Sequence, residues 1–207
     1  MCYRVEMKMD IRKIGKQFKA AADHPDSIVF DSEINGFAYP VLPVITADAP
    51  SKIELSYEWG LIPSWCRDEA IRKNTLNARI ESLSEKPAFK GVIANRCLVL
   101  ATGYFEWRWL DEKGKSKQKF GIHHASAEAF AFAGLYSFWR DPQGRQRNTF
   151  TICTTRANEQ MQYVHNTKQR MPVMLNPGDE QAWLDPTNDV QAFSFPRYTP
   201  DLVAFPN

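Results

Sequence analysis

NRCLVLATGYFEW, residues 95–107, is rich in β-branched and aromatic residues, a composition that predicts β-structure. Two earlier stretches share this composition: PVLPVIT at 40–46 and IELSYEWGLI at 53–62. All three are short and are separated by proline, glycine and polar residues, which is typical of strands joined by turns. The first half of the chain is therefore predicted to be mainly strands.

Two further pairs of strands are joined by recognisable turns. WRWL and KQKFGI flank the polar segment DEKGKS, which predicts a hairpin whose turn lies around Gly114. AFAFAGLYSFW and RNTFTICTT are joined by DPQG, and its proline and glycine are typical of a β-turn. Strands thus continue into the second half of the chain.

A few helices are expected among these strands. The apolar residues of IRKIGKQFKAAAD (11–23) recur at helical spacing, which predicts an amphipathic helix with a basic outer face. Short helices are expected over NEQMQYV (158–164) and after Asn176-Pro177, with asparagine as the cap and proline in the first turn. The sequence predicts one α+β domain over residues 1–207: a β-rich, twisted, partly closed, barrel-like antiparallel sheet with peripheral helices. Such a sheet leaves a groove across one face.

Length, composition and net charge limit the kinds of protein that this chain can be. A chain of 207 residues fits one sizeable domain, and 43% hydrophobic and 13% aromatic residues argue against disorder. The formal net charge is only +2, so overall charge gives no argument for a polyanionic partner. Nucleic-acid binding would have to come from a local basic groove.

The cysteines give no metal-binding pattern. They are scattered, with no CxxC motif and no histidine pairing at zinc spacing: Cys2, Cys66, Cys97 and Cys153. We expect reduced thiols in a cytoplasmic protein, and neither a metal nor another cofactor. The N-terminus has no apolar targeting region and no stretch approaches transmembrane length, so no membrane attachment is expected.

Cys2 is the most suggestive residue for chemistry. If Met1 is removed, the thiol and the α-amine of Cys2 lie on adjacent carbons. Such an aminothiol attacks an aldehyde twice: the amine forms an imine, and the thiolate then closes a thiazolidine ring. The amine titrates at about pKa 7.7–8 and a free thiol at about 8.5, so modest help activates both. A cysteine after the initiator methionine is, taken alone, more often incidental than catalytic.

Two other segments carry candidate proton-transfer groups. Glu106 lies between Phe105 and Trp107 at the end of an apolar strand, where desolvation would raise its pKa and suit a general acid or base. Simple alternation of the strand would instead turn Glu106 to water. His165, in VHNTKQRMPV (164–173), is placed at a helix end as a proton shuttle, although a single histidine is more often structural.

Two more segments combine polar or aromatic residues with turn signals. NARIES (77–82) contains polar groups next to apolar ones, but asparagine and serine are also ordinary turn residues. YEWGLIPSW (57–65) predicts a tight turn that carries an exposed tryptophan. Such a ring can stack on a nucleobase, worth about 1–3 kcal/mol per base, whereas core packing is the commoner role of tryptophan.

Together these segments resemble the SRAP family (SOS response-associated peptidase), whose members sense abasic sites in single-stranded DNA. The resemblance runs in order from residue 2 to about residue 175. It rests on Cys2 with Arg4, then WGLIPSW, NARIES, the Gly-x-Phe-Glu-Trp strand end and the His…RMPV segment. From about residue 185 onward the chain matches the family pattern poorly. The resemblance implies the SRAP fold for the whole domain.

The resemblance implies a covalent reaction and roles for four residues. SRAP proteins cross-link through the N-terminal cysteine to the ring-opened aldehyde of an abasic deoxyribose, giving a thiazolidine. Cys2 is then the nucleophile, and Asn77 orients the N-terminus and the sugar oxygen. Glu106 is the acid/base that helps to open the sugar, and His165 is the second proton shuttle. Lyase activity and a self-processing peptidase activity that removes Met1 are also implied.

The same resemblance implies the DNA contacts. Three arginines would hold backbone phosphates around the lesion: Arg4, Arg79 and Arg170. Two apolar side chains, Trp65 and Phe89, would wedge between bases, and Pro40 and Trp107 would line the pocket. The implied partner is single-stranded DNA with an abasic site, bound by a monomeric, nucleoid-associated protein of the SOS and DNA-repair response.

Four departures from the family pattern stand out. Tyr3 replaces the glycine of the common Cys-Gly-Arg start, and Cys66 replaces a second aromatic residue after Trp65. Three residues are inserted between His165 and the RMP segment, and the C-terminal stretch diverges. Two other functions remain open from the residues: an N-terminal-nucleophile hydrolase acting on peptides, or a non-enzymatic β-rich nucleic-acid-binding module.

Overall fold

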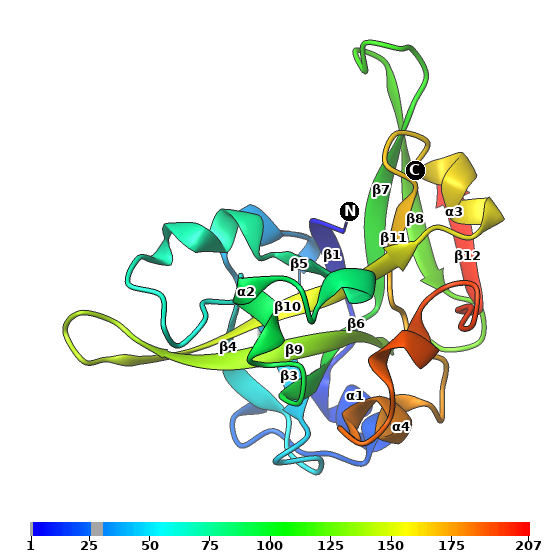
Figure 1. Ribbon diagram of the computed structural model, residues 1–207. Coiled ribbons are helices and arrows are strands. Elements are labelled where there is room, and N and C mark those ends of the chain that lie inside the picture. The colour runs from blue at the N-terminus through cyan, green and yellow to red at the C-terminus, as the bar shows by residue number, and fades with distance from the viewer. Residues whose placement is uncertain (1, 26–30) are drawn as a thin grey trace.

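The larger of two sheets closes into a barrel. The computed structural model describes residues 2–25 and 31–207. Five strands follow one another in the order β10-β4-β3-β6-β9, and the pairing of β9 with β10 closes the circle (Figure 1). They are β3 (Val41–Thr46), β4 (Glu54–Trp59), β6 (Arg96–Ala101), β9 (Phe130–Arg140) and β10 (Gln146–Arg156). Two short strands also pair with β10: β5 (Asn77–Arg79) and β11 (Arg170–Pro172).

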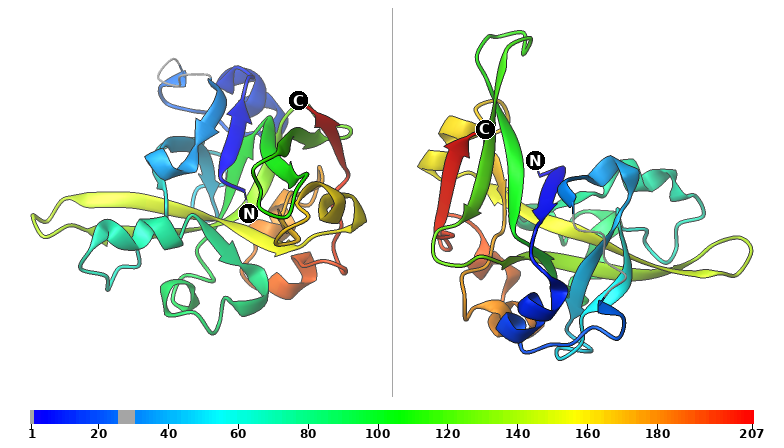
Figure 2. Two further views of the ribbon diagram at one scale, coloured as in Figure 1. Left: turned by 90° about the horizontal axis from the view of Figure 1, so that it is seen from above. Right: turned by 180° about the vertical axis from the view of Figure 1, so that it is seen from behind.

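The barrel is not purely antiparallel, which corrects one expectation. β10 runs parallel to β4 and to β5, while its pairings with β9 and β11 are antiparallel. Only β9 and β10 are joined by a tight turn, at Asp141–Gly144, where Gly144 has a φ of +81°. The other partners reach β10 through long connections, which place no constraint on strand direction. Figure 2 shows that the β9–β10 hairpin extends well beyond the barrel.

The smaller sheet is open and antiparallel. Its order is β12-β8-β7-β1-β2, so β1 lies between β2 and β7. The strands are β1 (Arg4–Met7), β2 (Asp31–Asn35), β7 (Gly103–Trp109), β8 (Lys117–His124) and β12 (Leu202–Pro206). The predicted β7–β8 hairpin is confirmed, with Gly114 at a φ of +63° in its turn. This hairpin projects from the body of the molecule (Figure 1).

The stretch 95–107 links the two sheets. Its first half is β6, in the barrel, and its second half begins β7, in the open sheet. Thr102 lies at the crossing, where its backbone N–H donates to the carbonyl of Glu6 at 2.9 Å. The next residue is Gly103, where there is no room for a side chain, because a Cβ would lie 2.7 Å from the His123 ring. The composition of 95–107 predicted strands here. It did not predict that the chain passes from the barrel to the open sheet at Thr102.

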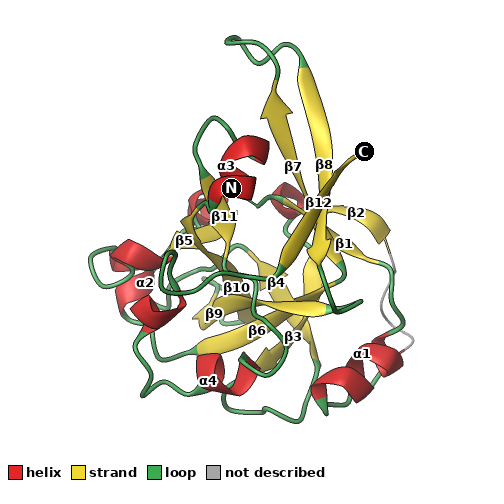
Figure 3. Cartoon of the chain, turned by 90° about the vertical axis from the view of Figure 1, so that its right-hand side faces the viewer, coloured by secondary structure: helices red, strands yellow, loops and turns green. Residues whose placement is uncertain are grey.

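Short helices surround the sheets (Figure 3). They are α1 (Ile11–Phe18), α2 (Pro87–Lys90), α3 (Glu159–Val164) and α4 (Glu180–Leu184), with 3-10 turns at Gly36–Ala38, Glu69–Asn74, Ile80–Ser82 and Val190–Phe193. Asn158 caps α3 by accepting from the N–H of Met161 at 2.9 Å. The first helix is shorter than predicted, because Lys19 adopts a left-handed conformation that ends it. Among the described residues, no helix is both long and apolar enough to cross a membrane.

The fourth helix begins later than predicted. Asn176 does not cap it, since Pro177 and Gly178 form a turn and α4 starts only after Asp179. The Asn176 side chain instead accepts from the backbone N–H of Asp201 at 2.8 Å. A tertiary contact has therefore displaced the local capping preference.

Alternate residues of the barrel strands face two hydrophobic clusters. On β9, Phe130 and Phe132 join one cluster, which also holds Tyr104 of the open sheet and is here called the inter-sheet cluster. Ala131 belongs to the other, the helix-side cluster, together with Ile14 of α1. Because both faces of β6 and β9 are covered, these two strands contain almost continuous apolar runs. The inter-sheet cluster extends to Cys2, two residues before β1, where the candidate site lies.

Candidate active site

Cys2 is buried at the N-terminal end of β1. Its side chain is 0% exposed and belongs to the inter-sheet cluster. Burial, and secondly the negative charge of nearby Glu106, raise the pKa of the thiol well above its ordinary value. The thiol is therefore protonated in this state. Met1, whose removal the sequence analysis expects, lies outside the described residues.

Asn77 fixes the backbone of Cys2. Its Nδ2 donates to the carbonyl oxygen of Cys2 at 2.8 Å. β5 holds Asn77 in place, because it pairs in parallel with β10 opposite Ile152. The Oδ1 atom of Asn77 is buried and accepts no hydrogen bond from the described residues. Asn77 thus grips the N-terminus with one end of its amide and offers an acceptor with the other.

Glu106 is a buried carboxyl group on β7. The residue is 5% exposed, so the alternative in which it faces water does not hold. Desolvation by burial raises its pKa from 4.5 to about 7. A carboxyl with this pKa is present in both protonation states near neutral pH. It can give a proton and take one back within a single reaction.

His165 lies beside Glu106, at the C-terminal end of α3. Its Nε2 is 3.9 Å from Oε2 of Glu106, and its Nδ1 is 2.9 Å from the carbonyl oxygen of Arg170. The backbone N–H of Arg170 also points at Nδ1, from 3.3 Å, and the shorter of the two contacts, to the carbonyl, favours the tautomer with the proton on Nδ1. Burial lowers the pKa of His165 to about 4. The two groups are thus a neutral imidazole and a carboxylic acid near its midpoint, not an ion pair.

Replacing Glu106 with glutamine should stabilise the protein at pH 8. The folded pKa of about 7 lies above the unfolded value of 4.5, so the carboxyl costs the native state stability as pH rises through that interval. A shift of this size corresponds to a difference on the order of 3 kcal/mol. Urea unfolding at pH 4 and pH 8 measures it. An equal difference between wild type and Glu106→Gln at both pH values would show that the carboxyl does not titrate in this way.

Asn166 is a site residue that the sequence analysis missed. Its Oδ1 accepts from the backbone N–H of Trp109 at 3.0 Å, and its Nδ2 donates to the Trp109 carbonyl at 2.9 Å. The guanidinium of Arg108 lies 3.8 Å from the Tyr163 ring centre. These contacts fasten the inserted loop after His165 to the β7–β8 hairpin. An asparagine in a polar loop gave no signal of this role.

Four of the residues expected to bind DNA are at least partly accessible. Arg4 is partly exposed, with its Nη1 3.0 Å from Oε1 of Glu33 and its guanidinium 6.0 Å from the Trp107 ring centre. Pro40 and Trp107 are partly buried. Arg79 is exposed at the end of β5, two residues after Asn77.

The two tryptophans of the 57–65 segment differ in their environment. Trp59 is completely buried, and its Nε1 donates to the carbonyl of Leu76 at 2.7 Å. Trp65 is 60% exposed. Core packing therefore applies to Trp59, and the exposed tryptophan expected in this segment is Trp65. The loop that carries Trp65 is held at Cys66, whose carbonyl accepts from Nε1 of Trp139 at 2.6 Å.

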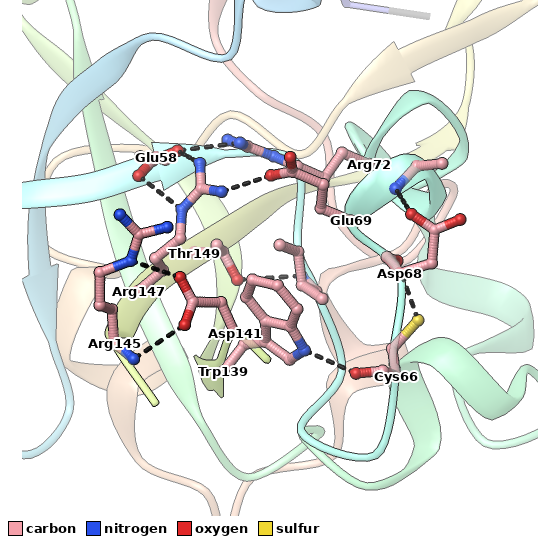
Figure 4. A network of polar contacts seen from close by, with 12 residues as sticks. Glu58, Cys66, Asp68, Glu69, Arg72, Trp139, Asp141, Arg145, Arg147 and Thr149 are labelled. Atoms are coloured by element: carbon pink, nitrogen blue, oxygen red, sulfur yellow. Dashed lines mark hydrogen bonds and ion pairs between the residues drawn. The ribbon is translucent and has the colours of Figure 1, made fainter. Parts of the chain in front are cut away.

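A network of charges fixes the base of the same loop (Figure 4). Arg147 on β10 contacts Glu58 of β4 and Glu69 of the following 3-10 turn. Arg72 is 3% exposed and lies 2.9 Å from Glu58, with its guanidinium 4.2 Å from the Tyr39 ring centre. These pairs connect the barrel to the Trp65 loop and limit the positions that the exposed ring can take.

Phe89 and Arg170 do not lie where their expected roles require. Phe89 is 7% exposed and packs in the helix-side cluster, so it is a core residue and not an exposed wedge. Arg170 is also 7% exposed, and both of its terminal nitrogens lie 2.8 Å from the carboxylate of Glu81. Its charge is neutralised inside the protein, so it is not presented to a phosphate. Glu81, inside the NARIES segment, was missed as its partner.

Replacing Arg170 with lysine should lower the free energy of unfolding by about 1–3 kcal/mol. Lysine cannot make the paired hydrogen bonds to Glu81, and a charged group then stays partly unsatisfied. Urea unfolding measures the loss. The exposed Arg79→Lys is the matched control and should change stability by less than about 0.5 kcal/mol. Equal stability of Arg170→Lys and wild type would contradict the structural role.

Comparison with known proteins gives consistent matches along the chain. The sequence model of the SOS response associated peptidase (SRAP) family matches residues 1–203, which includes the stretch after 185 where the motifs show little likeness. Abasic site processing protein YoqW, found in Bacillus subtilis and in Bacillus phage SPbeta, is 36% identical over 99% of this chain and 91% of its own length. Abasic site processing protein HMCES of Gallus gallus is 32% identical over 67% of this chain and 47% of its own length.

Solved structures agree with the architecture. A crystal structure of a protein from Bacteroides thetaiotaomicron superposes with a TM-score of 0.89 and 33% identity, over 99% of this chain and 91% of that one. A protein from Bordetella bronchiseptica superposes with a TM-score of 0.80 at 22% identity, over 100% of this chain and 99% of that one, and supports the fold alone. The β-rich, single-domain architecture predicted from the sequence is confirmed.

Proposed function

The chain belongs to the SRAP family, and we propose that it recognises an abasic site in single-stranded DNA and joins it covalently to Cys2. Relatives that carry the name abasic site processing protein support the substrate. The observation that carries the proposal is the arrangement around Cys2. Asn77 holds its carbonyl at 2.8 Å, and the charge of Glu106 acts on its thiol, with His165 3.9 Å from Glu106.

The reaction begins with opening of the sugar, because an abasic deoxyribose is mostly a closed hemiacetal. Glu106 in its acid form donates a proton to the ring oxygen as the bond from that oxygen to C1′ breaks. The resulting Glu106 carboxylate takes the proton of the C1′ hydroxyl, which becomes the aldehyde. The pKa of about 7 suits Glu106 to this step, since the acid form is still well populated near neutrality.

Cys2 then reacts with the aldehyde through both of its nucleophiles. After removal of Met1, the amine adds to C1′, and loss of one water gives the imine. The thiol adds to the same carbon as its proton passes to the imine nitrogen, which closes the thiazolidine. The balance is aldehyde plus aminothiol to thiazolidine plus one water. Because burial keeps the thiol protonated, the amine is the first nucleophile.

Neutral His165 assists the proton transfers. Its Nδ1–H is engaged with the Arg170 carbonyl, so the lone pair of Nε2 is directed toward the Glu106 side. The same base supports lyase chemistry from the imine: it removes a proton from C2′, and the 3′ phosphate leaves with the electrons of its C–O bond. Self-processing that removes Met1 completes the proposed set of activities.

The DNA strand is held by a few exposed groups. Arg79 and Arg4 are accessible and lie near Cys2, and Trp65 offers an exposed ring for stacking. Local arginines can hold phosphates in a protein whose net charge is only +2.

Replacing Arg79 with alanine should weaken DNA binding in a salt-dependent way. One lost phosphate contact should reduce the slope of log affinity against log salt concentration by about 0.7 for single-stranded DNA. Fluorescence anisotropy across a salt series measures this. Arg12→Ala, which removes an exposed arginine on α1, is the control and should keep the wild-type slope. An unchanged slope for Arg79→Ala would remove Arg79 from the phosphate path.

A denaturing gel tests the proposed function. Processed protein is incubated with a single-stranded oligonucleotide that carries one abasic site, and with matched oligonucleotides that carry either an intact base or a tetrahydrofuran analogue without the aldehyde. A slow band with the first oligonucleotide alone is the expected result. No band from protein whose intact mass shows that Met1 is absent would refute the proposal.

A further inference from the structure

Two aromatic rings lie together beside the nucleophile. Tyr3 directly follows Cys2, and its ring centre is 4.8 Å from that of Phe37, with the planes inclined by 41°. The Phe37 side chain is 50% exposed, although it is large and apolar. This pair is formed by a residue that departs from the Cys-Gly-Arg family start and by a residue outside every motif of the site.

The backbone holds the pair in place. The N–H of Gly36 donates to the carbonyl of Tyr3 at 2.9 Å, and the N–H of Phe37 donates to Oδ1 of Asn35 at 3.2 Å. The 3-10 turn Gly36–Ala38 lies directly against Trp59, since a Cβ on Gly36 would come within 2.9 Å of that buried ring. Phe37 is therefore presented on a rigid base and does not depend on a loose loop.

A DNA strand with an abasic site contains a group that an exposed aromatic ring beside Cys2 could bind: the base next to the lesion. The abasic nucleotide has no base, so the neighbouring base has lost a stacking partner on the side that faces the lesion. The lesion sugar is joined to Cys2, and the Cα atoms of consecutive residues are about 3.8 Å apart. Tyr3 therefore lies next to the lesion sugar, and a flanking nucleotide on the Tyr3 side of the lesion comes within reach of the Tyr3–Phe37 pair.

We propose that the Tyr3–Phe37 pair stacks on the nucleobase adjacent to the abasic sugar and takes the place of the missing base. The inference rests on the proposed function and adds a subsite for the neighbouring nucleotide. Stacking on an aromatic ring does not depend on base identity, so this subsite accepts any base and rejects only its absence. Trp65 belongs to a different loop and makes a separate contact.

The test measures equilibrium affinity with oligonucleotides that cannot react. Each carries a tetrahydrofuran site, flanked on both sides either by adenine or by further tetrahydrofuran spacers without bases. Phe37→Ala should bind the adenine-flanked strand about tenfold or more weakly than wild type, within the 5- to 150-fold range of one lost stack. It should bind the spacer-flanked strand as well as wild type does, and Phe37→Trp should restore the affinity for adenine.

Phe205→Ala is the matched control, because Phe205 is 59% exposed on β12 and has no part in the proposed subsite. It should bind both strands with wild-type affinity. An equal loss of affinity by Phe37→Ala for both strands, or no loss for either, would overturn the subsite. A failure of the proposed function is separate: it is the absence of a covalent band between wild-type protein and an aldehyde-bearing strand.

Discussion

Cys2→Ser should form no adduct that survives denaturation with an abasic oligonucleotide. Serine keeps the α-amine after Met1 removal, so the reversible imine can still form. It lacks the sulfur that closes the thiazolidine, and the imine hydrolyses when the protein is denatured. The band seen with wild type on a denaturing gel should disappear entirely. This is the largest change that the account predicts for any single substitution.

Two additions make the Cys2→Ser result specific. Borohydride, which reduces an imine to a stable amine, should recover a trapped product from Cys2→Ser protein whose intact mass shows that Met1 is absent, and this shows that the variant folds and binds DNA. Cys66→Ser is the control, because Cys66 is a partly exposed thiol whereas Cys97 and Cys153 are buried. It should form the adduct at the wild-type level. A stable band from Cys2→Ser without borohydride would place the covalent bond on another residue.

Glu106→Gln should slow adduct formation by about 10²- to 10⁴-fold, the usual contribution of one well-placed acid/base group. Glutamine keeps the shape of the side chain but cannot donate a proton to the ring oxygen. The same variant is expected to be more stable at pH 8, so a slower reaction cannot be attributed to unfolding. Single-turnover time courses on denaturing gels measure the rates.

The pH dependence of this effect follows from the raised pKa. Because the folded pKa of Glu106 is about 7, its acid form predominates below pH 6 and is largely lost by pH 8. The ratio of the wild-type rate to the Glu106→Gln rate removes the pH effects that the two proteins share. That ratio should fall as pH rises through 7. A ratio that does not change with pH would remove Glu106 as the acid.

A second buried carboxyl provides the control for Glu106. Glu6 is 4% exposed on β1, in the same sheet, and pairs with Lys8 at 2.7 Å. Glu6→Gln should react at the wild-type rate if the protein remains folded, which a thermal melt checks. An equally slow Glu6→Gln would mean that loss of a buried carboxyl, and not loss of the acid that protonates the ring oxygen, explains the defect.

Local signals in the sequence predicted the elements well. Composition identified strands in 95–107 and in the two hairpins, and Asn158 capped its helix as expected. Closure of the barrel could not be predicted from local sequence, because the parallel pairing of β10 with β4 joins residues about ninety positions apart. The direction of such a pairing depends on how the whole chain packs, because no tight turn joins the two strands and fixes their relative direction.

The sequence predicted which residues form the candidate site more reliably than it predicted where their side chains point. Residues 103–106 of β7 are all buried, so strand alternation could not decide whether Glu106 faces water. Phe89 and Arg170 match family positions, but burial in the core and the distant partner Glu81 give them structural environments. The motifs therefore located the chemistry, while the contacts that orient each group had to come from the fold.

The most direct test of the account is the mass of the adduct and the position of its attachment. Wild-type protein is reacted with a short abasic oligonucleotide without any reductant, and the product is analysed intact and after digestion. We predict the mass of the chain without Met1 plus that of the oligonucleotide less one water, with the sugar on Cys2 and neither a free amine nor a free thiol there. An adduct that retains Met1, or one attached to a lysine, would contradict the account.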